Sequence, residues 1–595
     1  MRNSLLICIC ILSLACLVHS QTEVWRVKGN LALQDNQGNT YIARGYAQDG
    51  AYGAPDTLVK VSPTGDILWK VPVEALYYQL LLSESGIYLT PRRWTTPGAV
   101  YHYDANGTLL WRYPLPSSGH MVDLPRVDQV GNIIIAYDSA GTRQPISSKL
   151  LKLKPNGERV FEVSIPAITP NAYQQIILGP AIASDGNIWV LAQAAAATEK
   201  QQNGRYSYKA FGYEDAMLFN GGTGALLLRK NIFQGLFEQS TDDGKGNTKE
   251  YSFNNASYGG PTLFVRSSGN NLVAGGYLDY IANNCRSNRS CKMVQKSEWR
   301  MMIVDPAGNV SPFRYRGRGD YRGSDSRTEY RGDDENNILS EILVGTNNIL
   351  FLHGRIAQGK ATNGIGPLRT EDILMRFNAS TKKIEWKIVT SFPSSQADIT
   401  TYFYEPSQNI LRQRDNKTID VYSNAGQLST TPLVFPDQTF LTPQFDDYSI
   451  RNIENGSIIL KALNCSTTPC EILIAKYSIA GLLAKQNFTR QVAQYGAESD
   501  YQFSLTQNYP NPFNPTTTIE FELAQDALVT VKVYNTLGQA VATPAANEEF
   551  GEGINQLEFD GSSLPSGVYY FRIIAQDREG KGILYSGVKK MLLVR

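Results

Sequence analysis

The fold is decided by a phrase that reads Val61-Ser-Pro-Thr-Gly65-Asp-Ile-Leu-Trp69. A glycine turn separates two apolar segments, and the second segment ends in a bulky residue. This pattern predicts two antiparallel strands joined by a tight turn. Related phrases recur along the chain at 103–111, 153–161, 219–227, 304–309, 377–386, 422–427 and 477–483.

A second phrase alternates with the first. It is an apolar hairpin around a Gly or Asn turn, and copies lie at 35–42, 128–134, 184–190 and 345–351. About eight pairs of phrases fit between Gln21 and Thr489, and the tightest repeat is about forty residues, the length of one four-stranded propeller blade. The sequence therefore predicts an all-β chain with a propeller of about eight blades. Seven or nine blades, or an array of β-sandwiches, are the alternatives.

The first phrase resembles the Asp-x-x-Thr-Gly-x-x-x-Trp repeat of quinoprotein-like β-propellers, named for the cofactor pyrroloquinoline quinone. The resemblance implies the fold and does not by itself imply the cofactor. Trp69 and Trp111 are expected to wedge between neighbouring blades, because an aromatic ring buries a large area there. The segment Glu23–Val27 looks like one more such strand, and we expect it to close the ring by pairing into the last blade.

The C-terminal segment has its own strand pattern. Ile519, Phe521 and Leu523 alternate with polar residues, as do the valines at 529, 531 and 533. Turn signals lie at 535–538 and 564–567, so short strands and turns predict a small immunoglobulin-like β-sandwich. The prolines at 510, 512 and 515 cannot donate ladder hydrogen bonds, so the segment that contains them should be an extended lead-in.

This segment also resembles the C-terminal sorting domain of type IX secretion substrates from Bacteroidetes-like bacteria. The resemblance implies a translocation address that is read by the type IX secretion machinery, and an ordinary terminal β-domain is the alternative. The residues that carry the resemblance are Asn508, Tyr509, Pro510, Asn511, Pro512, Phe513, Asn514, Pro515, Gly538, Gly567, Lys589 and Lys590.

The N-terminal segment predicts a signal peptide. Arg2 precedes an apolar run from Leu5 to Val18, and a cleavage site is expected before Gln21. An uncleaved anchor is one alternative, and a lipoprotein at Cys16 is another. With the tail, this predicts export through the periplasm to a secreted or cell-surface-attached state, without a transmembrane segment in the mature chain. The expected domains are a signal peptide at 1–20, a propeller at 21–489, a linker at 490–504 and the sorting domain at 505–595.

Composition excludes one partner class and suggests a compartment. The chain carries 56 Lys and Arg against 55 Asp and Glu, so no overall positive field favours nucleic acid. The expected mature chain keeps four cysteines in two close pairs, which suits an oxidising compartment. We expect the disulfides Cys285–Cys291 and Cys465–Cys470; a zinc site is the alternative, although no histidine lies beside either pair.

The long insertions lie in blades between about residues 180 and 340. Residues 197–214 and 278–298 are expected as loops between the second and third strands of a blade, and 235–259 and 317–337 as loops between blades. All should lie on one rim, the expected site of ligand recognition. Aromatic residues there suit glycan or protein ligands, although packing of these rings onto the rim is the alternative. They are Tyr206, Tyr208, Phe211, Tyr213, Tyr251, Phe253 and Tyr258.

Catalysis and cofactors find little support in the sequence. The three histidines of the expected mature chain, at 102, 120 and 353, fall in different blades, and no nucleophile elbow or phosphate loop is present. Active quinoprotein dehydrogenases show an adjacent Cys-Cys pair, which this chain lacks, so pyrroloquinoline quinone is not expected. The run Asp333-Asp-Glu335 offers oxygen ligands for calcium, with a solvated charged loop as the alternative. The sequence thus favours a non-enzymatic binding module over a secreted propeller hydrolase or lyase acting on polysaccharide.

Overall fold

The computed structural model divides the chain into two compact units, residues 1–493 and 494–595. Every element described is a β-strand, and this part of the chain contains no apolar helix of membrane-spanning length. The expected signal peptide lies outside the described residues. The structure describes residues 22–28, 31–44, 56–73, 78–91, 93–94, 98–116, 119–139, 147–168, 174–202, 205–242, 248–252, 262–285, 291–315, 328–330, 336–345, 348–358, 369–393, 402–404, 409–413, 418–429, 432–434, 453–454, 457–464, 471–478, 488–489, 503–508, 510–523, 527–550, 553–577 and 582–594.

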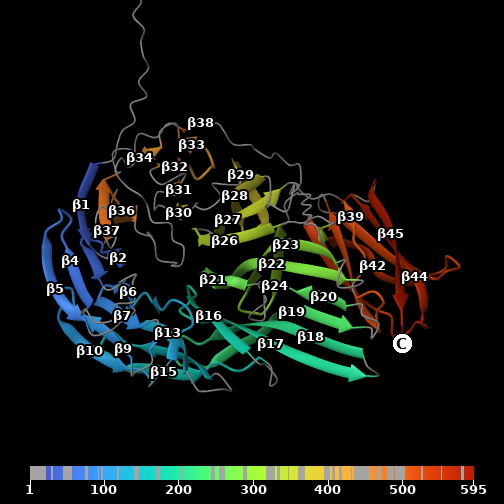
Figure 1. The fold of residues 1–595 in the computed structure, drawn as a ribbon, viewed down its shortest axis with the longest axis horizontal. Coiled ribbons are helices and arrows are strands. Elements are labelled where there is room, and N and C mark those ends of the chain that lie inside the picture. Colours follow the sequence, from blue (N-terminus) through green and yellow to red (C-terminus); the bar gives the residue numbers. More distant parts are fainter. Residues whose placement is uncertain are drawn as a thin grey trace, which may run out of the picture. The chain divides into compact units, whose positions relative to one another are not determined.

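The first unit is a β-propeller, and its described strands form eight blades (Figure 1). Blade 1 contains β2 (Leu31–Gln34), β3 (Thr40–Arg44), β4 (Asp56–Val61) and β5 (Ile67–Val73). Blade 2 contains β6 (Tyr78–Ser83), β7 (Gly86–Pro91), β9 (Ala99–Tyr103) and β10 (Leu109–Pro114). Blade 3 contains β11 (Gly119–Met121), β13 (Ile133–Ser139), β14 (Ser147–Leu153) and β15 (Arg159–Ser164), with β8 (Arg93–Trp94) and β12 (Arg126–Val127) beside them.

Blades 4 and 5 are joined into one ten-stranded sheet. Blade 4 contains β16 (Gln174–Ile182), β17 (Ile188–Gln202), β18 (Arg205–Phe219) and β19 (Leu226–Asp242). Blade 5 contains β21 (Thr262–Ser268), β22 (Asn271–Cys285), β23 (Cys291–Val304) and β24 (Val310–Tyr315). Two further strands belong to this sheet, β20 (Thr248–Ser252) and β25 (Thr328–Tyr330).

Three blades complete the ring. Blade 6 contains β26 (Asn336–Val344), β27 (Ile349–Gln358), β28 (Arg369–Asn378) and β29 (Lys383–Pro393). Blade 7 contains β30 (Tyr402–Tyr404), β31 (Ile410–Gln413), β32 (Thr418–Tyr422) and β33 (Leu428–Ser429), with β34 (Leu433–Val434) and β38 (Phe488–Thr489). Blade 8 contains β35 (Ile453–Glu454), β36 (Ser457–Asn464), β37 (Glu471–Ser478) and β1 (Thr22–Lys28).

The N-terminal strand closes the ring, as the sequence predicted. β1 pairs antiparallel with β37, so Thr22 faces Ser478 and Lys28 faces Leu473 in the ladder. Trp25 of β1 is buried in a cluster with Ile42 and Val59 of blade 1. The last blade is therefore completed by the first strand, and the seam between blades 8 and 1 becomes an ordinary blade-to-blade contact.

The bulky residue of the repeat packs against a glycine turn in the following blade. The indole N–H of Trp111 in blade 2 donates to the carbonyl of Pro155 in blade 3 at 2.7 Å, and its ring covers Gly157. His102 Nδ1 donates to the same carbonyl at 3.0 Å. Two other seams have the same pair of donors. Trp69 and Lys60 both donate to the Ala105 carbonyl, and Trp386 and Arg376 both donate to the Asn424 carbonyl.

A β-bulge aims these residues into the seam. In blade 2, Leu109 pairs with Tyr103 but Trp111 pairs with His102, so Leu110 is the extra residue. The bulge reverses the alternation at that point, which leaves Leu110 half exposed and turns Trp111 inward. The same irregularity precedes Trp25, Trp69 and Trp386, and also Phe161 and Leu228, which occupy the bulky position of blades 3 and 4.

The hydrophobic cores of the propeller lie between blades. One cluster joins Tyr88 and Val100 of blade 2 to Ile133 and Leu151 of blade 3. Comparable clusters occupy the other described seams from blade 8 through blade 1 to blade 7. Each of blades 1 to 6 is thus stabilised by its two neighbours, because a four-stranded sheet cannot bury both faces alone.

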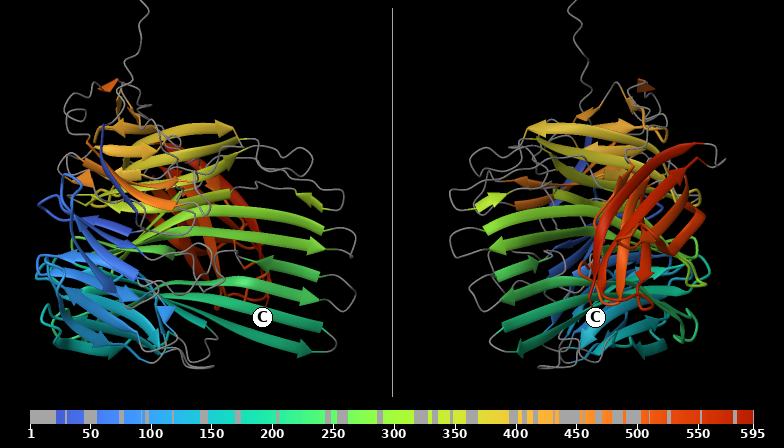
Figure 2. Two further views of the ribbon diagram at one scale, coloured as in Figure 1. Left: turned by 60° about the vertical axis from the view of Figure 1, so that its left-hand side comes forward. Right: turned by 90° about the vertical axis from the view of Figure 1, so that its right-hand side faces the viewer.

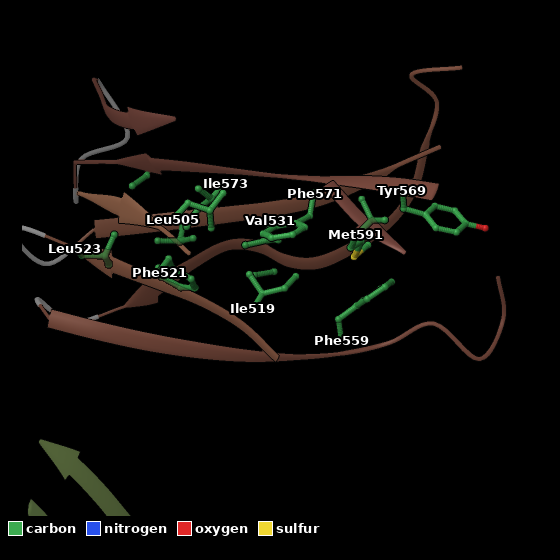
Figure 3. Packing of buried hydrophobic residues seen from close by; sticks show 14 of the residues in the cluster. Leu505, Ile519, Phe521, Leu523, Val531, Phe559, Tyr569, Phe571, Ile573 and Met591 are labelled. Atoms are coloured by element: carbon green, nitrogen blue, oxygen red, sulfur yellow. The ribbon is translucent and has the colours of Figure 1, made fainter. Parts of the chain in front are cut away.

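The second unit is a two-layer β-sandwich. One sheet has β39 (Ser504–Leu505), β40 (Thr516–Leu523) and β43 (Gly553–Asp560), and the other has β42 (Ala540–Phe550), β41 (Ala527–Tyr534), β44 (Gly567–Gln576) and β45 (Ile583–Leu593). The alternating residues predicted from the sequence, Ile519, Phe521 and Leu523, are fully buried between the layers (Figure 3). The predicted immunoglobulin-like class is confirmed in its two-sheet, antiparallel form.

Gly157→Ala is expected to destabilise the propeller more than the matched change Gly186→Ala. The two glycines have φ of +84° and +81°, so both changes add similar left-handed strain of about 1–2 kcal/mol. A Cβ at 157 would lie 3.0 Å from ring atoms of Trp111, whereas a Cβ at 186 would meet nothing within 4 Å. Thermal unfolding of both variants measures the difference. Equal losses would contradict a stabilising role for the ring–glycine contact.

Candidate functional site

The insertions of blades 4 and 5 form one continuous sheet, which we call the wing. It comprises residues 194–202, 205–214, 233–242, 248–252, 277–285, 291–299 and 328–330. Strands β17, β18, β19, β22 and β23 are 14–17 residues long, whereas the described strands of the six other blades have at most 11 residues. β20 pairs with β19 on one side and β22 on the other, and β25 adds to β23 in parallel. Figure 2 shows these strands, teal to yellow-green, extending side by side from the ring.

The expectation that these insertions are loops was wrong. The described parts of 197–214 and 278–298 form pairs of antiparallel strands instead, and described parts of 235–259 and 317–337 contribute β20 and β25. The physical reason is that Tyr206-Ser-Tyr208-Lys-Ala-Phe211-Gly-Tyr213 alternates with the period of a strand, and successive added strands supply backbone partners for one another. The insertions still leave the ring on one side, because strands of a blade are antiparallel.

The structure divides the predicted aromatic residues between the faces of the wing. Successive strand positions alternate between faces, so positions 206 and 208 of β18 belong to one face and 211 and 213 to the other. Position 251 of β20 shares the face of 211, through its register with Gln239 and Lys209. Phe253 and Tyr258 lie outside the described residues. The predicted residues therefore do not form a single patch.

One of the two predicted cysteine pairs lies in described strands. Cys285 and Cys291 are directly opposed in the register of β22 and β23. Cys465 and Cys470 lie outside the described residues, but the residues just inside them, Asn464 and Glu471, are opposed in β36 and β37. Opposed antiparallel residues have Cα atoms about 4.5–5.5 Å apart, a separation that a disulfide spans. The disulfides stay predictions.

A buried carboxylate lies at the root of the wing, where β18 leaves blade 4. Glu214 is fully buried and accepts hydrogen bonds from Gln193 Nε2 at 2.8 Å, and from Thr262 N at 2.8 Å and Oγ1 at 3.0 Å. Burial raises the pKa of Glu214, while the Thr262 backbone and the charge of Arg300 act in the opposite direction. Thr262 begins β21, so this carboxylate attaches the first strand of blade 5 to blade 4.

The next residue completes the polar cluster. Asp215 accepts from Arg229 Nε at 2.6 Å and from Asn231 Nδ2 at 2.9 Å, and Asn231 also donates to the Glu214 carbonyl. These bonds lie at a bulge in β19, where Ile232 is the extra residue opposite Glu214 and Asp215 of β18. Sequence reasoning missed Glu214 because its partners are Gln193 and Thr262, 21 and 48 residues away. The cluster is closed to solvent at Glu214, so it is suited to structural support and not to proton exchange with a substrate.

Histidines and metal ligands give no centre in the described part of the chain. His102 lies in β9, His120 in β11 and His353 in β27, in three different blades as predicted. His102 stacks on Tyr88 at 4.2 Å, and burial lowers its pKa, so the ring serves blade packing in its neutral form. The described residues contain no group of three or more His, Cys, Asp or Glu that could hold a metal. The predicted calcium ligands at 333–335 lie outside them.

The sorting motif fastens the start of the C-terminal unit to its last strand. Asn511 Oδ1 accepts from Leu592 N at 2.8 Å, and Phe513 N donates to Leu592 O at 2.9 Å. Phe513 forms a parallel bridge with Leu593 and is buried against Phe559. Residues 510–515 lead into β40 and form no ladder strand apart from this bridge, as predicted. The expectation of an extended backbone was wrong, because residues 510–512 and 514–515 are bends that bring Asn511 and Phe513 to Leu592.

The remaining motif residues have separate roles. Asn508 is buried and donates to Thr517 Oγ1 at 2.9 Å, which in turn donates to the Pro510 carbonyl at 2.8 Å. Gly538 has φ +78° in a turn closed by Asn535. Lys589 and Lys590 are exposed on β45, and Tyr509 lies outside the described residues. Pro512 and Asn514 are exposed, and Gly567 begins β44 opposite Leu593.

Comparison with protein families identifies the second unit. Residues 507–582 match the family described as the secretion system C-terminal sorting domain. Curated proteins yield no match. The match covers only the tail, and it confirms the resemblance inferred from the motif.

Solved structures similar to the chain have low identity. Sqt1 of Saccharomyces cerevisiae is 7% identical with a TM-score of 0.36, over 77% of this chain and 99% of that one. The polysaccharide lyase Uly1 is 9% identical with a TM-score of 0.37, over 77% and 100%. The α-L-arabinanase of Penicillium chrysogenum is 9% identical with a TM-score of 0.29, over 60% and 92%.

The two units together define a class of protein. The ring of blades is a β-propeller, and the tail is a sorting domain of type IX secretion. The chain is thus an export substrate with a propeller as its body, and the tail implies interaction with the type IX machinery and a secreted or cell-surface location.

Glu214→Gln is expected to make the stability of the propeller less dependent on pH. The folded protein loses stability as the pH rises from 4.5, the ordinary pKa of the carboxyl, through the raised pKa of the folded state. The reason is that the carboxyl ionises at lower pH in the unfolded chain than in the folded one. The variant should therefore gain apparent Tm relative to wild type at pH 8 compared with pH 5. Scans across this range measure the effect, with the exposed Glu158→Gln as control. A parallel shift at every pH would contradict the buried ionisation.

Proposed function

We propose that the chain is a non-enzymatic binding protein, exported through the periplasm, whose wing recognises a glycan or protein outside the cell. The observation that carries the proposal is the wing itself. Two blades extend into a joint sheet of seven strands, and ordinary packing of a propeller requires no such extension. Its aromatic positions offer flat rings for stacking, next to polar neighbours.

The ionisable groups support binding over catalysis. Among the described carboxyls with a resolved change, Glu214 alone has a raised pKa, and it is fully buried. The others have lowered pKa values. Hydrogen bonds from backbone N–H groups, first that of Thr108, lower the pKa of Asp104, and the Asn309 side chain followed by its backbone N–H lowers that of Asp305. Acid–base catalysis needs a carboxyl pair with separated pKa values that can reach substrate, and Glu214 is closed to solvent.

Binding and cleavage can be separated in one experiment on the purified chain without its tail. We expect binding to one or more extracellular polysaccharides and no release of reducing ends or unsaturated products. A Tyr206→Ala, Tyr208→Ala variant and a Phe211→Ala, Tyr251→Ala variant test the two faces, and we expect about tenfold or greater weakening for the face that stacks on the ligand. Cleavage products would reject the non-enzymatic proposal in favour of a hydrolase or lyase.

Removal of residues 505–595 is expected to stop export at the periplasm. The tail forms a separate compact unit, so the propeller should retain its fold and ordinary Tm. Immunoblots of periplasmic and culture fractions measure the distribution. A milder variant, Asn511→Ala, loses the bond to Leu592 N and should reduce export without abolishing folding of the body. Secretion of the truncated chain at the wild-type level would reject the address role.

A further inference from the structure

The wing separates opposite charges onto its two faces. Register partners follow one another across the strands from Lys200 in β17 through Ser207, Thr241, Lys249 and Asn284 to Lys292 in β23. A parallel row, two positions nearer the ring, contains Lys209 and Tyr251. Rows two positions apart belong to the same face of a sheet. We call this the lysine face.

The bias extends over the whole wing. The lysine face has six basic positions against two acidic ones, and the opposite face has, apart from the buried Glu214 at the root, five acidic positions and no basic one within the described wing. The basic positions are Lys200, Arg205, Lys209, Lys249, Lys292 and Lys296, with Glu298 and Glu329 as the acidic ones. The acidic positions of the other face are Glu199, Glu238, Asp242, Glu250 and Asp279.

This arrangement identifies a class of ligand. Charged positions on both faces are incompatible with burial of either face in an apolar core, since unpaired charges are costly to desolvate. Lys200 and Lys292 are five strand spacings apart, about 24 Å at about 4.8 Å per spacing. Charges spread over that length cannot converge on one small anion, so they fit a polymer that carries repeated negative charges.

We propose that the lysine face binds an extended anionic polysaccharide across the strands of the wing. The proposal rests on the proposed function and specifies its ligand. Aromatic positions 211, 251 and 280 share this face with the lysines, which suits sugar rings between charged groups. The export tail favours an extracellular polysaccharide over nucleic acid, and the nearly neutral whole chain supplies no general positive field.

The test compares matched triple variants of the full mature chain. The lysine variant neutralises one row and carries Lys200→Gln, Lys249→Gln and Lys292→Gln. The glutamate variant removes three charges from the same region of the other face and carries Glu199→Gln, Glu238→Gln and Glu250→Gln. Probes are polygalacturonate, neutral dextran and duplex DNA. We expect wild type to bind polygalacturonate, about tenfold or greater weakening in the lysine variant, none in the glutamate variant, and loss of affinity as NaCl rises.

The other outcomes overturn the proposal in distinguishable ways. Dextran binding that the lysine variant retains would reject the lysine face and keep the proposed function. Absence of binding to either polysaccharide would reject the lysine-face proposal and leave only a protein ligand for the proposed function. DNA binding as tight as polygalacturonate binding would indicate a general polyanion site. Salt-sensitive multimers without a probe, abolished by either variant, would indicate that lysine and acidic faces of two copies pair instead. Lys249→Gln alone replaces the triple variant if the latter fails to fold.

Discussion

The propeller depends on one repeated contact, a ring from one blade that lies over a glycine turn of the next. The contact combines shape and polarity. Trp111 covers Gly157, where a side chain would collide, and its N–H satisfies the Pro155 carbonyl that the turn exposes. A second donor, His102, reaches the same oxygen. Because buried polar groups need partners, the turn is stable in the seam only when the neighbouring blade is in register.

The wing shows how the same scaffold accommodates an addition. The seams keep their cores in blades 4 and 5, while the outer ends of the strands continue into a sheet that belongs to neither blade alone. Glu214 lies where the wing joins the packed blades, and it links Thr262 of blade 5 to Gln193 of blade 4. A rigid root of this kind allows a charged, solvated surface to project from a packed ring.

The sequence predicted those parts of the fold that residues close together in the chain determine. The glycine turn, the bulge and the ring at Gly65 and Trp69 lie within a few residues, so the blade, its seam and the closing strand could be expected from sequence. The sandwich was equally readable from Ile519, Phe521 and Leu523. The wing was not, because β20 is a strand only through β19 and β22, which lie on either side of it in two blades. Glu214 could not be predicted, because its environment depends on Thr262, which is distant in the sequence. The residues next to Glu214 contain no pattern that indicates this contact.

Closure by β1 has a consequence for the order of folding. Thr22 pairs with Ser478, so the last seam joins segments separated by most of the body and forms only after blade 8 has been made. Such distant contacts are slow to form, because the entropy of closing a long loop opposes them. Until then β37 has an unpaired edge and blade 1 an uncovered apolar side, the features that promote aggregation in partly folded chains. A body cut short before Ser478 would therefore remain an open arc.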